Sequence, residues 1–419
     1  MSHRLLELLP AGAEVDADGT LRIAGCRLDD LAAEFGTPAI VVDEASLRAR
    51  AREYRTALTS RWPHARVVFA SKAFPATAVQ RVMVEEGIGL DVAGGGEILS
   101  ALRAGVDPAL MVMHGNAKTT EELRIAVDAG LGLVVVDNAD DVDRLEELVP
   151  PGRTQDVLVR MIPEVESSTH PHVQTGQVGS KFGLTAAAAK ALIARIEQSP
   201  RLEMRGVHAH VGSQIMDPAE LAAAVAPLAA LGTFPVYDLG GGLGARYTYD
   251  EHPAAVDEYV EALLAAARVH LPAEAELIIE PGRSMVNASA LTLYTVTTVK
   301  RDARTFVAVD GGMGDNLEVA LFHQRYEAAL AARMHEDDAE DVVVVGRHCE
   351  SGDVLIDPLR LPAPRVGDLL AVPATGAYTH TMANNYNGYR RPPVVFVRDG
   401  EARAVIRREN WDDLFARDL

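Results

Sequence analysis

One lysine at the end of an apolar segment is the first residue of this sequence that could carry out chemistry. Lys72 follows the run Val67–Ala70, and Pro75 interrupts the pattern shortly afterwards. β-Branched and aromatic residues without polar alternation predict a buried strand. Partial desolvation beyond such a strand lowers the pKa of a lysine and leaves a neutral amine that can attack a carbonyl. For an isolated lysine, a stem packed on the strand with its ammonium in water is the simpler interpretation.

Two further segments place polar groups after strand-like runs. His210 is followed by Gly212 and Ser213, which leave room for a flat ligand under the imidazole, although such a histidine is more often simply packed. Three consecutive glycines could turn their backbone N–H groups towards one phosphate, whereas a tight turn is the alternative interpretation. No Walker-type Lys-Ser/Thr follows them. These glycines are Gly240, Gly241 and Gly242.

A carboxylate and a guanidinium follow another apolar run, in the segment Glu280-Pro281-Gly282-Arg283. A buried carboxylate is costly unless it is paired, and one use for it is to hold a proton on a ring nitrogen. Arg283 offers a fork for a phosphate or a carboxylate. The alternative is that Glu280 and Arg283 satisfy each other.

A lysine, a glycine turn, a ring-facing histidine and a strand-end glutamate together predict pyridoxal phosphate, held as a Schiff base on Lys72. Glu280 would keep the pyridine protonated and strongly electron-withdrawing, which favours decarboxylation; an arginine there would suit a racemase.

The segment His348–Asp353 is a polar turn with one thiol, and taken alone it indicates no function. No metal is expected, because His170, His172, His348 and Cys349 lack the spacing of a zinc site.

The elements that must position these residues alternate between strand and helix. Nine β-rich segments, from Ala39–Val42 to Leu277–Ile279, are separated by helical stretches, which indicates βαβ units. The fold class predicted is α/β, a (β/α)₈ barrel, because eight or nine units in about 250 residues fit a barrel better than an open sheet. Short strand signals with turns then predict a mostly antiparallel β-domain, with one helical pattern at Asn316–Met334. The domains expected are residues 1–37 packing with the β-domain, a cofactor-binding barrel at 38–284 and the β-domain at 285–419.

Composition restricts the class of protein. The chain has 419 residues, a formal charge of −20 and two cysteines, Cys26 and Cys349. The negative charge disfavours nucleic acid as a partner. No apolar run reaches the ~18 residues that span a bilayer, and no signal peptide is evident. Two cysteines suggest no disulfide framework, so a cytoplasmic location is expected.

The ordered motifs resemble those of the fold-type III pyridoxal-phosphate decarboxylases, the family of the diaminopimelate decarboxylases, over residues 36–414. The shared segments are Ala70-Ser71-Lys72-Ala73, Leu90-Asp91-Val92, His114-Gly115-Asn116-Ala117-Lys118, Ser180-Lys181-Phe182-Gly183-Leu184, His210-Val211-Gly212-Ser213-Gln214, Gly240-Gly241-Gly242, Glu280-Pro281-Gly282-Arg283, Asp310-Gly311-Gly312-Met313, His348-Cys349-Glu350-Ser351-Gly352-Asp353 and Gly376-Ala377-Tyr378.

The resemblance implies an alanine-racemase-type barrel with a β-domain, an amino-acid substrate and a homodimer whose subunits share active sites. It implies that Lys72 forms the Schiff base, that His210 stacks on the ring and that Glu280 pairs with the pyridine nitrogen. The glycine turn and Tyr378 would hold the phosphate. Cys349 and Glu350 would reach in from the other subunit, to protonate the product and contact its distal amine.

One segment departs from the family pattern. Glu318 and Phe322 occupy positions where diaminopimelate decarboxylases usually have an arginine and a tyrosine near the distal carboxylate of the substrate. A reversed charge in a desolvated pocket would cost several kcal/mol, although Arg283 could pair with Glu318. Two hypotheses therefore stand: decarboxylation of meso-diaminopimelate to lysine, or of another amino acid such as ornithine, lysine, arginine or a specialised metabolite. A racemase and a non-catalytic carrier of pyridoxal phosphate are more remote alternatives.

Overall fold

The structure, a computed structural model, describes residues 4–165, 179–337 and 339–419, which form two compact units. One unit comprises residues 50–244 and 253–285, and the other comprises residues 1–49, 245–252 and 286–419. His170 and His172, considered above as metal ligands, lie outside the described residues. None of the helices in these described ranges has the length and apolarity needed to cross a membrane.

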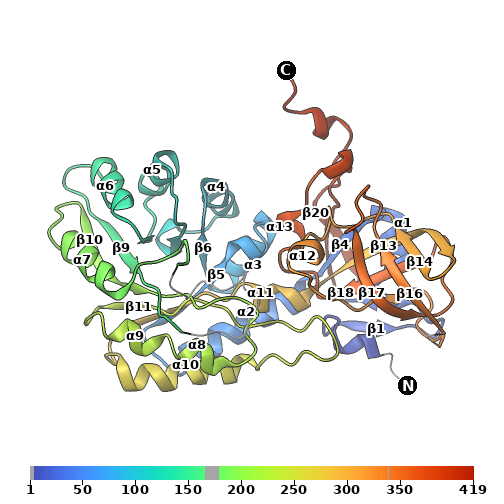
Figure 1. The fold of residues 1–419 in the computed structure, drawn as a ribbon, viewed down its shortest axis with the longest axis horizontal. Coiled ribbons are helices and arrows are strands. Elements are labelled where there is room, and N and C mark those ends of the chain that lie inside the picture. The colour runs from blue at the N-terminus through green and yellow to red at the C-terminus, as the bar shows by residue number, and fades with distance from the viewer. Residues whose placement is uncertain (1–3, 166–178, 338) are drawn as a thin grey trace. The chain divides into compact units, whose positions relative to one another are not determined.

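The first unit is a closed barrel of eight parallel strands (Figure 1), as predicted. The strands are three to seven residues long, and most of their residues are buried because both faces are covered. In order around the barrel they are β10 (Leu202–His208), β11 (Val236–Asp238), β12 (Glu276–Ile279), β5 (Ala65–Ala70), β6 (Gly89–Val92), β7 (Met111–Met113), β8 (Leu133–Val136) and β9 (Gln155–Arg160).

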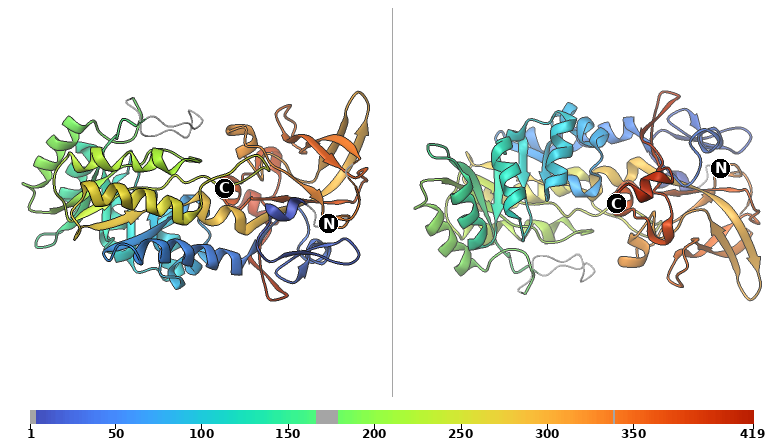
Figure 2. Two further views of the ribbon diagram at one scale, coloured as in Figure 1. Left: turned by 90° about the horizontal axis from the view of Figure 1, so that it is seen from below. Right: turned by 90° about the horizontal axis from the view of Figure 1, so that it is seen from above.

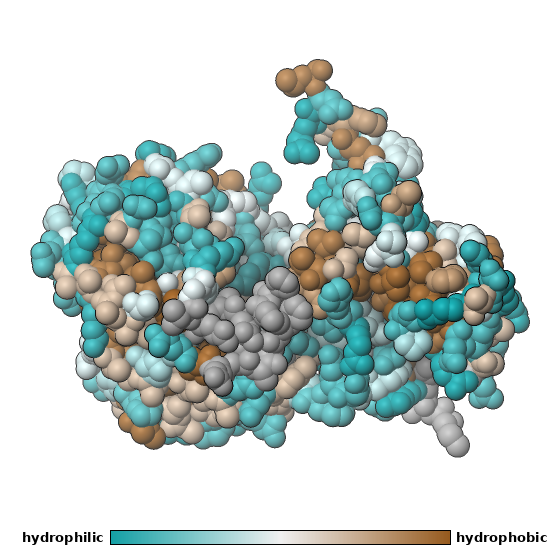
Figure 3. Space-filling model, viewed as in Figure 1, coloured by the Kyte–Doolittle hydropathy of each residue, from teal (hydrophilic) through white to brown (hydrophobic). Residues whose placement is uncertain are grey.

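Helices follow each barrel strand, one more helix precedes β5, and they lie outside the barrel (Figure 2). Side-chain caps fix where several begin: Thr119 and Glu122 form a capping box on α5, and Asn138 caps α6. Figure 3 shows mostly hydrophilic residues over α5 and α6, as expected for solvent-facing sides. The helices are α2 (Glu44–Thr59), α3 (Thr77–Glu85), α4 (Gly95–Ala104), α5 (Thr120–Ala129), α6 (Ala139–Leu148), α7 (Ala186–Ile196), α8 (Pro218–Ala222), α9 (Val225–Ala229), α10 (Val256–His270) and α11 (Arg283–Val286).

Apolar side chains from alternate positions fill the barrel. One buried cluster joins strands on opposite sides of it, so the interior is a packed core. All eight strands run in the same direction, and the residues that follow them therefore meet at one end, where such barrels keep their chemistry. The cluster consists of Val68, Val112, Leu133, Val135, Leu158, Val236 and Ile278.

The second unit contains a nine-stranded, mostly antiparallel sheet, also as predicted. Among the described strand pairs of this sheet, only two are parallel, β14 with β16 and β4 with β19. The strands are β4 (Ala39–Asp43), β13 (Ala290–Arg301), β14 (Thr305–Val309), β15 (Ala329–Leu330), β16 (Glu340–Val345), β17 (Val354–Leu361), β18 (Leu369–Pro373), β19 (Val394–Arg398) and β20 (Glu401–Ile406). A small sheet of β1 (Ala13–Val15), β2 (Leu21–Ile23) and β3 (Cys26–Arg27) and helix α1 (Leu28–Phe35) precede β4.

Two elements differ from the sequence predictions. The strand Ala39–Val42 was counted among the barrel units, but β4 pairs with β13 and β19 in the sheet of the second unit. Every residue of β4 is buried, and a central strand of a mixed sheet has the same apolar pattern as a barrel strand. The helical pattern at Asn316–Met334 yields only α12 (Glu318–Leu321) followed by β15.

Candidate active site

Lys72 lies directly after a barrel strand, where the sequence predicts it. It belongs to the short 3₁₀ helix Ser71–Ala73 that follows β5, and the Gln80 amide holds this turn by donating to Ser71 Oγ at 2.8 Å. The Lys72 side chain is half-exposed, and its Nζ lies 4.0 Å from Oδ2 of Asp91 on the adjacent strand β6. Burial raises the pKa of the Asp91 carboxyl, against the opposing charges of His114 and Lys72.

The triple-glycine turn follows β11 and cannot accept side chains. A Cβ at Gly241 would lie 2.0 Å from the Glu280 carbonyl oxygen, and one at Gly240 would lie 2.5 Å from the Ala209 carbonyl oxygen. Gly240 also has a φ of +66°, in the region that favours glycine. The Gly241 N–H donates to His210 Nδ1 at 3.3 Å, which ties the turn to the predicted stacking histidine. Burial lowers the pKa of His210 well below its usual range, so its imidazole is neutral.

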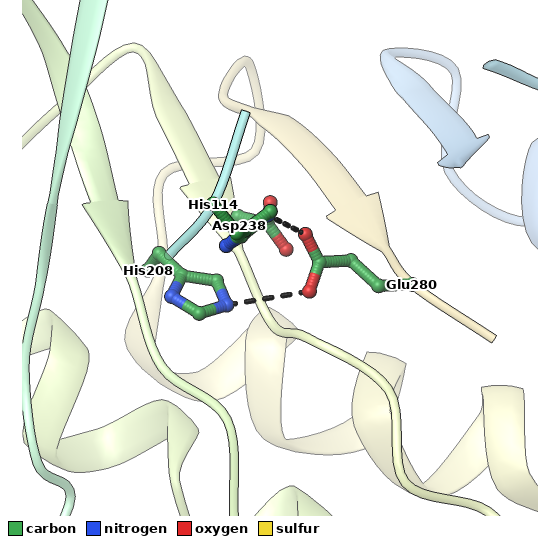
Figure 4. A group of neighbouring side chains, drawn as sticks. All are labelled: His114, His208, Asp238 and Glu280. Atoms are coloured by element: carbon green, nitrogen blue, oxygen red, sulfur yellow. Dashed lines mark ion pairs between the residues drawn. The ribbon is translucent and has the colours of Figure 1, made fainter. Parts of the chain in front are cut away.

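Four buried polar side chains meet at the carboxyl end of the barrel (Figure 4). Glu280 follows β12, His208 ends β10, Asp238 ends β11 and His114 follows β7. Glu280 Oε1 lies 2.5 Å from His114 Nε2, and Oε2 lies 3.3 Å from His208 Nε2. All four side chains are buried. The ion pairs of Glu280 are thus with these histidines, which differs from the alternative in which Arg283 satisfies it.

Charge in this group is concentrated on Glu280. Burial opposes ionisation of Glu280, but its contacts with His114 and then His208 outweigh burial and lower the pKa of Glu280 well below its usual range. Burial lowers the pKa of His208 to about 3. Burial, and then the neighbouring Glu280, raise the pKa of Asp238 well above its usual range. At neutral pH, Glu280 is therefore an anion and Asp238 a neutral acid.

Arg283, Ser213 and Gly282 also lie in the barrel unit. Arg283 begins α11, is buried and donates from Nε to Ser213 Oγ at 3.3 Å. Gly282 packs against the end of β5, since a Cβ there would lie 2.9 Å from the Cβ of Ala70. The turn around Ser213 is strained, because Gln214 has a φ of +58°.

The remaining candidates lie in the second unit. Cys349 is exposed, and its backbone N–H donates to Asn387 Oδ1 at 2.9 Å. The exposed Glu350 carboxylate accepts from the Tyr386 hydroxyl at 2.6 Å. Tyr378 has a φ of +58°, a conformation that costs about 1–3 kcal/mol for a residue with a side chain and that clusters at ligand sites.

Glu318 and Phe322 stand at the two ends of α12. Glu318 is only 1% exposed, and its Oε2 accepts from the Tyr326 hydroxyl at 3.1 Å and from the Tyr247 hydroxyl at 3.3 Å. The two tyrosine rings pack edge to face with centroids 5.3 Å apart. Phe322 is half-buried at the end of the helix.

Sequence reasoning assigned no role to four buried polar residues that the barrel brings together with Glu280. Asp91 and His114 stood only within segments shared with the family, and His208 and Asp238 were not singled out. Each lies in or directly after a strand, and polar residues there point into the ligand end of such a barrel. That position was the signal that could have identified them.

The residues present fit pyridoxal phosphate. Several buried polar atoms of this group have no well-aligned hydrogen bond within the described residues: Glu280 Oε1, His114 Nε2, both ring nitrogens of His208 and Asp238 Oδ2. A ring nitrogen that carries a proton would satisfy a carboxylate oxygen here. The three glycines of the turn pack against neighbouring backbone where no side chain fits, and backbone N–H groups of such a turn can bind a phosphate.

A metal ion fits the same group less well. Its four ligand atoms lie within 4.8 Å of one another. Two ligands of tetrahedral zinc at the usual bond lengths are roughly 3.3 Å apart, whereas His114 Nε2 and Glu280 Oε1 are 2.5 Å apart and so contact each other directly.

Comparisons with known proteins agree with this chemistry. Residues 44–287 match the family model described as pyridoxal-dependent decarboxylase, pyridoxal binding domain. The chain is 42% identical to the diaminopimelate decarboxylase of Bacillus subtilis over 96% of this chain and 95% of that one. It is 43% identical to the enzyme of the same name from Actinosynnema pretiosum, over 98% and 95%.

A solved structure shows the same fold. The crystal structure of diaminopimelate decarboxylase from M. jannaschii in co-complex with L-lysine superimposes with a TM-score of 0.91, at 29% identity, over 98% of each chain. Three predictions are thereby confirmed: the chain is a pyridoxal-phosphate-dependent carboxy-lyase, its cofactor is pyridoxal phosphate, and its fold is of the alanine-racemase type. The chain belongs to the diaminopimelate decarboxylase family of pyridoxal-dependent decarboxylases.

Proposed function

We propose that the chain removes the α-carboxylate of meso-diaminopimelate and releases L-lysine and carbon dioxide. Relatives at about 40% identity over nearly the whole chain are named for this substrate. The main structural support for the proposal concerns Glu318. This residue stands where an arginine is usual, and the change of charge had favoured a cationic substrate. Its Oε2 accepts two phenol hydrogen bonds inside the second unit, so this oxygen is engaged in the packing of that unit. The hypothesis of an ornithine-like substrate required the Glu318 carboxylate to face the substrate. Because Oε2 is engaged with Tyr326 and Tyr247, this hypothesis is the less favoured one.

The residues of this chain would divide the work as follows. The Lys72 amine would hold the cofactor through its aldehyde carbon, and the backbone N–H groups of the triple-glycine turn would bind its phosphate, together with Tyr378. Pyridoxal phosphate, when bound, supplies a sink for the electron pair left at Cα when carbon dioxide departs. Glu280, held as an anion, would keep the proton on the ring nitrogen that makes this sink strong.

The other predicted residues would orient the cofactor and the substrate and protonate the product. His210 would fix the plane of the ring, and Arg283 and Ser213, which bond each other, would bind anionic groups. Cys349 would return a proton to Cα, and Glu350 would bind the distal amine. We propose that both belong to the second subunit of a homodimer with shared active sites. Their exposure in the single chain supports this arrangement.

We also infer a reducing, cytoplasmic location from the two free cysteines, Cys26 and Cys349.

Steady-state kinetics on meso-diaminopimelate, ornithine, lysine and arginine test the substrate. We expect turnover of meso-diaminopimelate to lysine, with Glu318→Gln retaining most of it, and no turnover of the other three. A kcat/KM for ornithine or arginine that exceeds the value for meso-diaminopimelate would overturn the proposal. Product analysis separates carbon dioxide release from inversion at Cα, the outcome expected of a racemase.

Two controls test the site residues. Borohydride should fix the cofactor covalently on Lys72, and Lys72→Ala protein should be colourless. Mixing inactive Lys72→Ala and Cys349→Ala chains should restore part of the activity through hybrid dimers with one intact site. An absence of recovery despite proven subunit exchange would contradict a shared site.

A further inference from the structure

The two histidines on Glu280 form a clamp that the cofactor-binding motifs do not include. His114 comes from the segment after β7 and His208 from the end of β10, on opposite sides of Glu280 in the order of the strands. Each histidine approaches a different carboxylate oxygen through its Nε2, at 2.5 Å and 3.3 Å (Figure 4). Their rings pack edge to face, with centroids 4.8 Å apart. Glu280 is therefore contacted by a histidine at each of its oxygens.

We propose that His114 and His208 are positioning residues that hold Glu280 as an anion aimed at the ring nitrogen of the cofactor. This inference rests on the proposed function, because it gives Glu280 the same role. A carboxylate oxygen has two lone-pair directions, so a histidine on each oxygen leaves others for a ring N–H. Without these contacts, a glutamate that is 5% exposed would take up a proton or rotate away.

The surroundings of each histidine support this assignment. His208 is fully buried, and neither of its ring nitrogens has a well-aligned hydrogen bond within the described residues, so no partner at Nδ1 competes with the proposed tautomer, in which Nε2 carries the proton towards Glu280. His114 Nε2 also lies 3.8 Å from Asp91 Oδ1, between two carboxylates. The same nitrogen therefore faces both carboxylates, and its contact with Glu280 is the shorter.

Asp238 extends this network to the phosphate-binding turn. Its Oδ1 accepts from the Gly240 N–H at 3.0 Å, and its carboxylate also belongs to the group whose ligand atoms, Glu280 included, lie within 4.8 Å of one another. As a neutral acid, Asp238 adds no second negative charge beside Glu280. The residue that holds the ring nitrogen and the turn that holds the phosphate are therefore joined through one buried side chain.

The test compares two amides of different length at each histidine. His114→Gln places an N–H₂ group near the former Nε2, whereas His114→Asn is too short to reach Glu280, and both keep a polar side chain. His208→Gln and His208→Asn form the second pair, and the exposed His270→Asn is the control. Each protein is loaded with pyridoxal phosphate labelled with ¹⁵N in the ring, and the ¹⁵N chemical shift reports whether that nitrogen carries a proton.

We expect the wild type, the control and both glutamine variants to show a protonated ring nitrogen. The asparagine variants should shift towards the unprotonated value, with kcat lowered by about tenfold to a hundredfold, the range typical of residues that support a ligand-holding side chain, and with KM little changed. Asparagine variants that keep the wild-type shift and kcat would overturn the positioning role and leave the proposed function intact. An unprotonated nitrogen in the wild type would instead overturn the role given to Glu280.

Discussion

Two buried glutamates, one in each unit, show how surroundings decide what the same side chain does. Glu280 faces two histidines, and its Oε1 has no well-aligned hydrogen bond in the described parts of the chain. Glu318 has an oxygen that accepts two tyrosine hydroxyls with ordinary hydrogen-bond lengths. Glu280 therefore retains capacity for a ligand, whereas Glu318 contributes to the packing of its own unit. Burial alone would not distinguish them, because both are at most 5% exposed.

The largest expected difference is in turnover. Glu280→Gln keeps the shape of the side chain but removes the charge, so kcat on meso-diaminopimelate should fall by about 10²–10³, as when a preorganised electrostatic group is lost. Glu318→Gln should lower kcat by less than about tenfold, since tyrosine hydroxyls can also donate to an amide oxygen. Steady-state kinetics of both variants measure the two changes in kcat, and absorbance checks that each variant holds the cofactor. The reverse order of effects would mean that Glu318, and not Glu280, acts in the reaction.

Stability should distinguish the tyrosines on Glu318 from an exposed counterpart. Tyr326→Phe removes a hydroxyl that donates to a buried carboxylate and should lower the free energy of unfolding by about 1.5–3 kcal/mol. Tyr386→Phe removes the same kind of bond to the exposed Glu350 and should cost less than about 1 kcal/mol. Urea unfolding of both variants measures the difference. Equal costs would show that the Glu318 cluster contributes no more than a surface contact.

The sequence was sufficient to predict the fold class and the strand-end positions of several candidate residues. Strand-helix alternation predicted a barrel, and the strand-end positions of Lys72 and Glu280 follow from local patterns. The membership of β4 could not be predicted, because its pairing with β13 and β19 depends on residues more than 200 positions away. The hydrogen bonds of Glu318 could not be predicted for the same reason, since Tyr247 is 71 residues away in the sequence. Contacts between distant segments leave little trace in a local pattern.

Titration gives a further comparison, because the stability contributed by Asp315, which lies near α12, should change with pH in the opposite direction to that contributed by Glu280. Asp315 is buried, and burial raises its pKa from 3.8 to about 7, against the opposing charge of Arg347. A raised native pKa means that the folded state binds more protons, so stability falls as pH rises from about 4 to 7. Integrated between pH 5 and pH 7, the loss is roughly 2 kcal/mol. Glu280 has a lowered pKa, so its contribution is instead lost as pH falls below its unfolded value.

Asp315→Asn isolates this effect. Its amide oxygen can still accept the Gly312 N–H, which Asp315 Oδ2 accepts at 3.0 Å, but it does not titrate. The variant should match the wild type near pH 4 and exceed it in unfolding free energy above pH 7, whereas the exposed Asp302→Asn should follow the wild type throughout. Denaturant titrations at several pH values measure the two curves. If Asp315→Asn ran parallel to the wild type at every pH, Asp315 would be ionised in both states, and the β-unit would tolerate a buried charge without the compensation that Glu280 receives from its histidines.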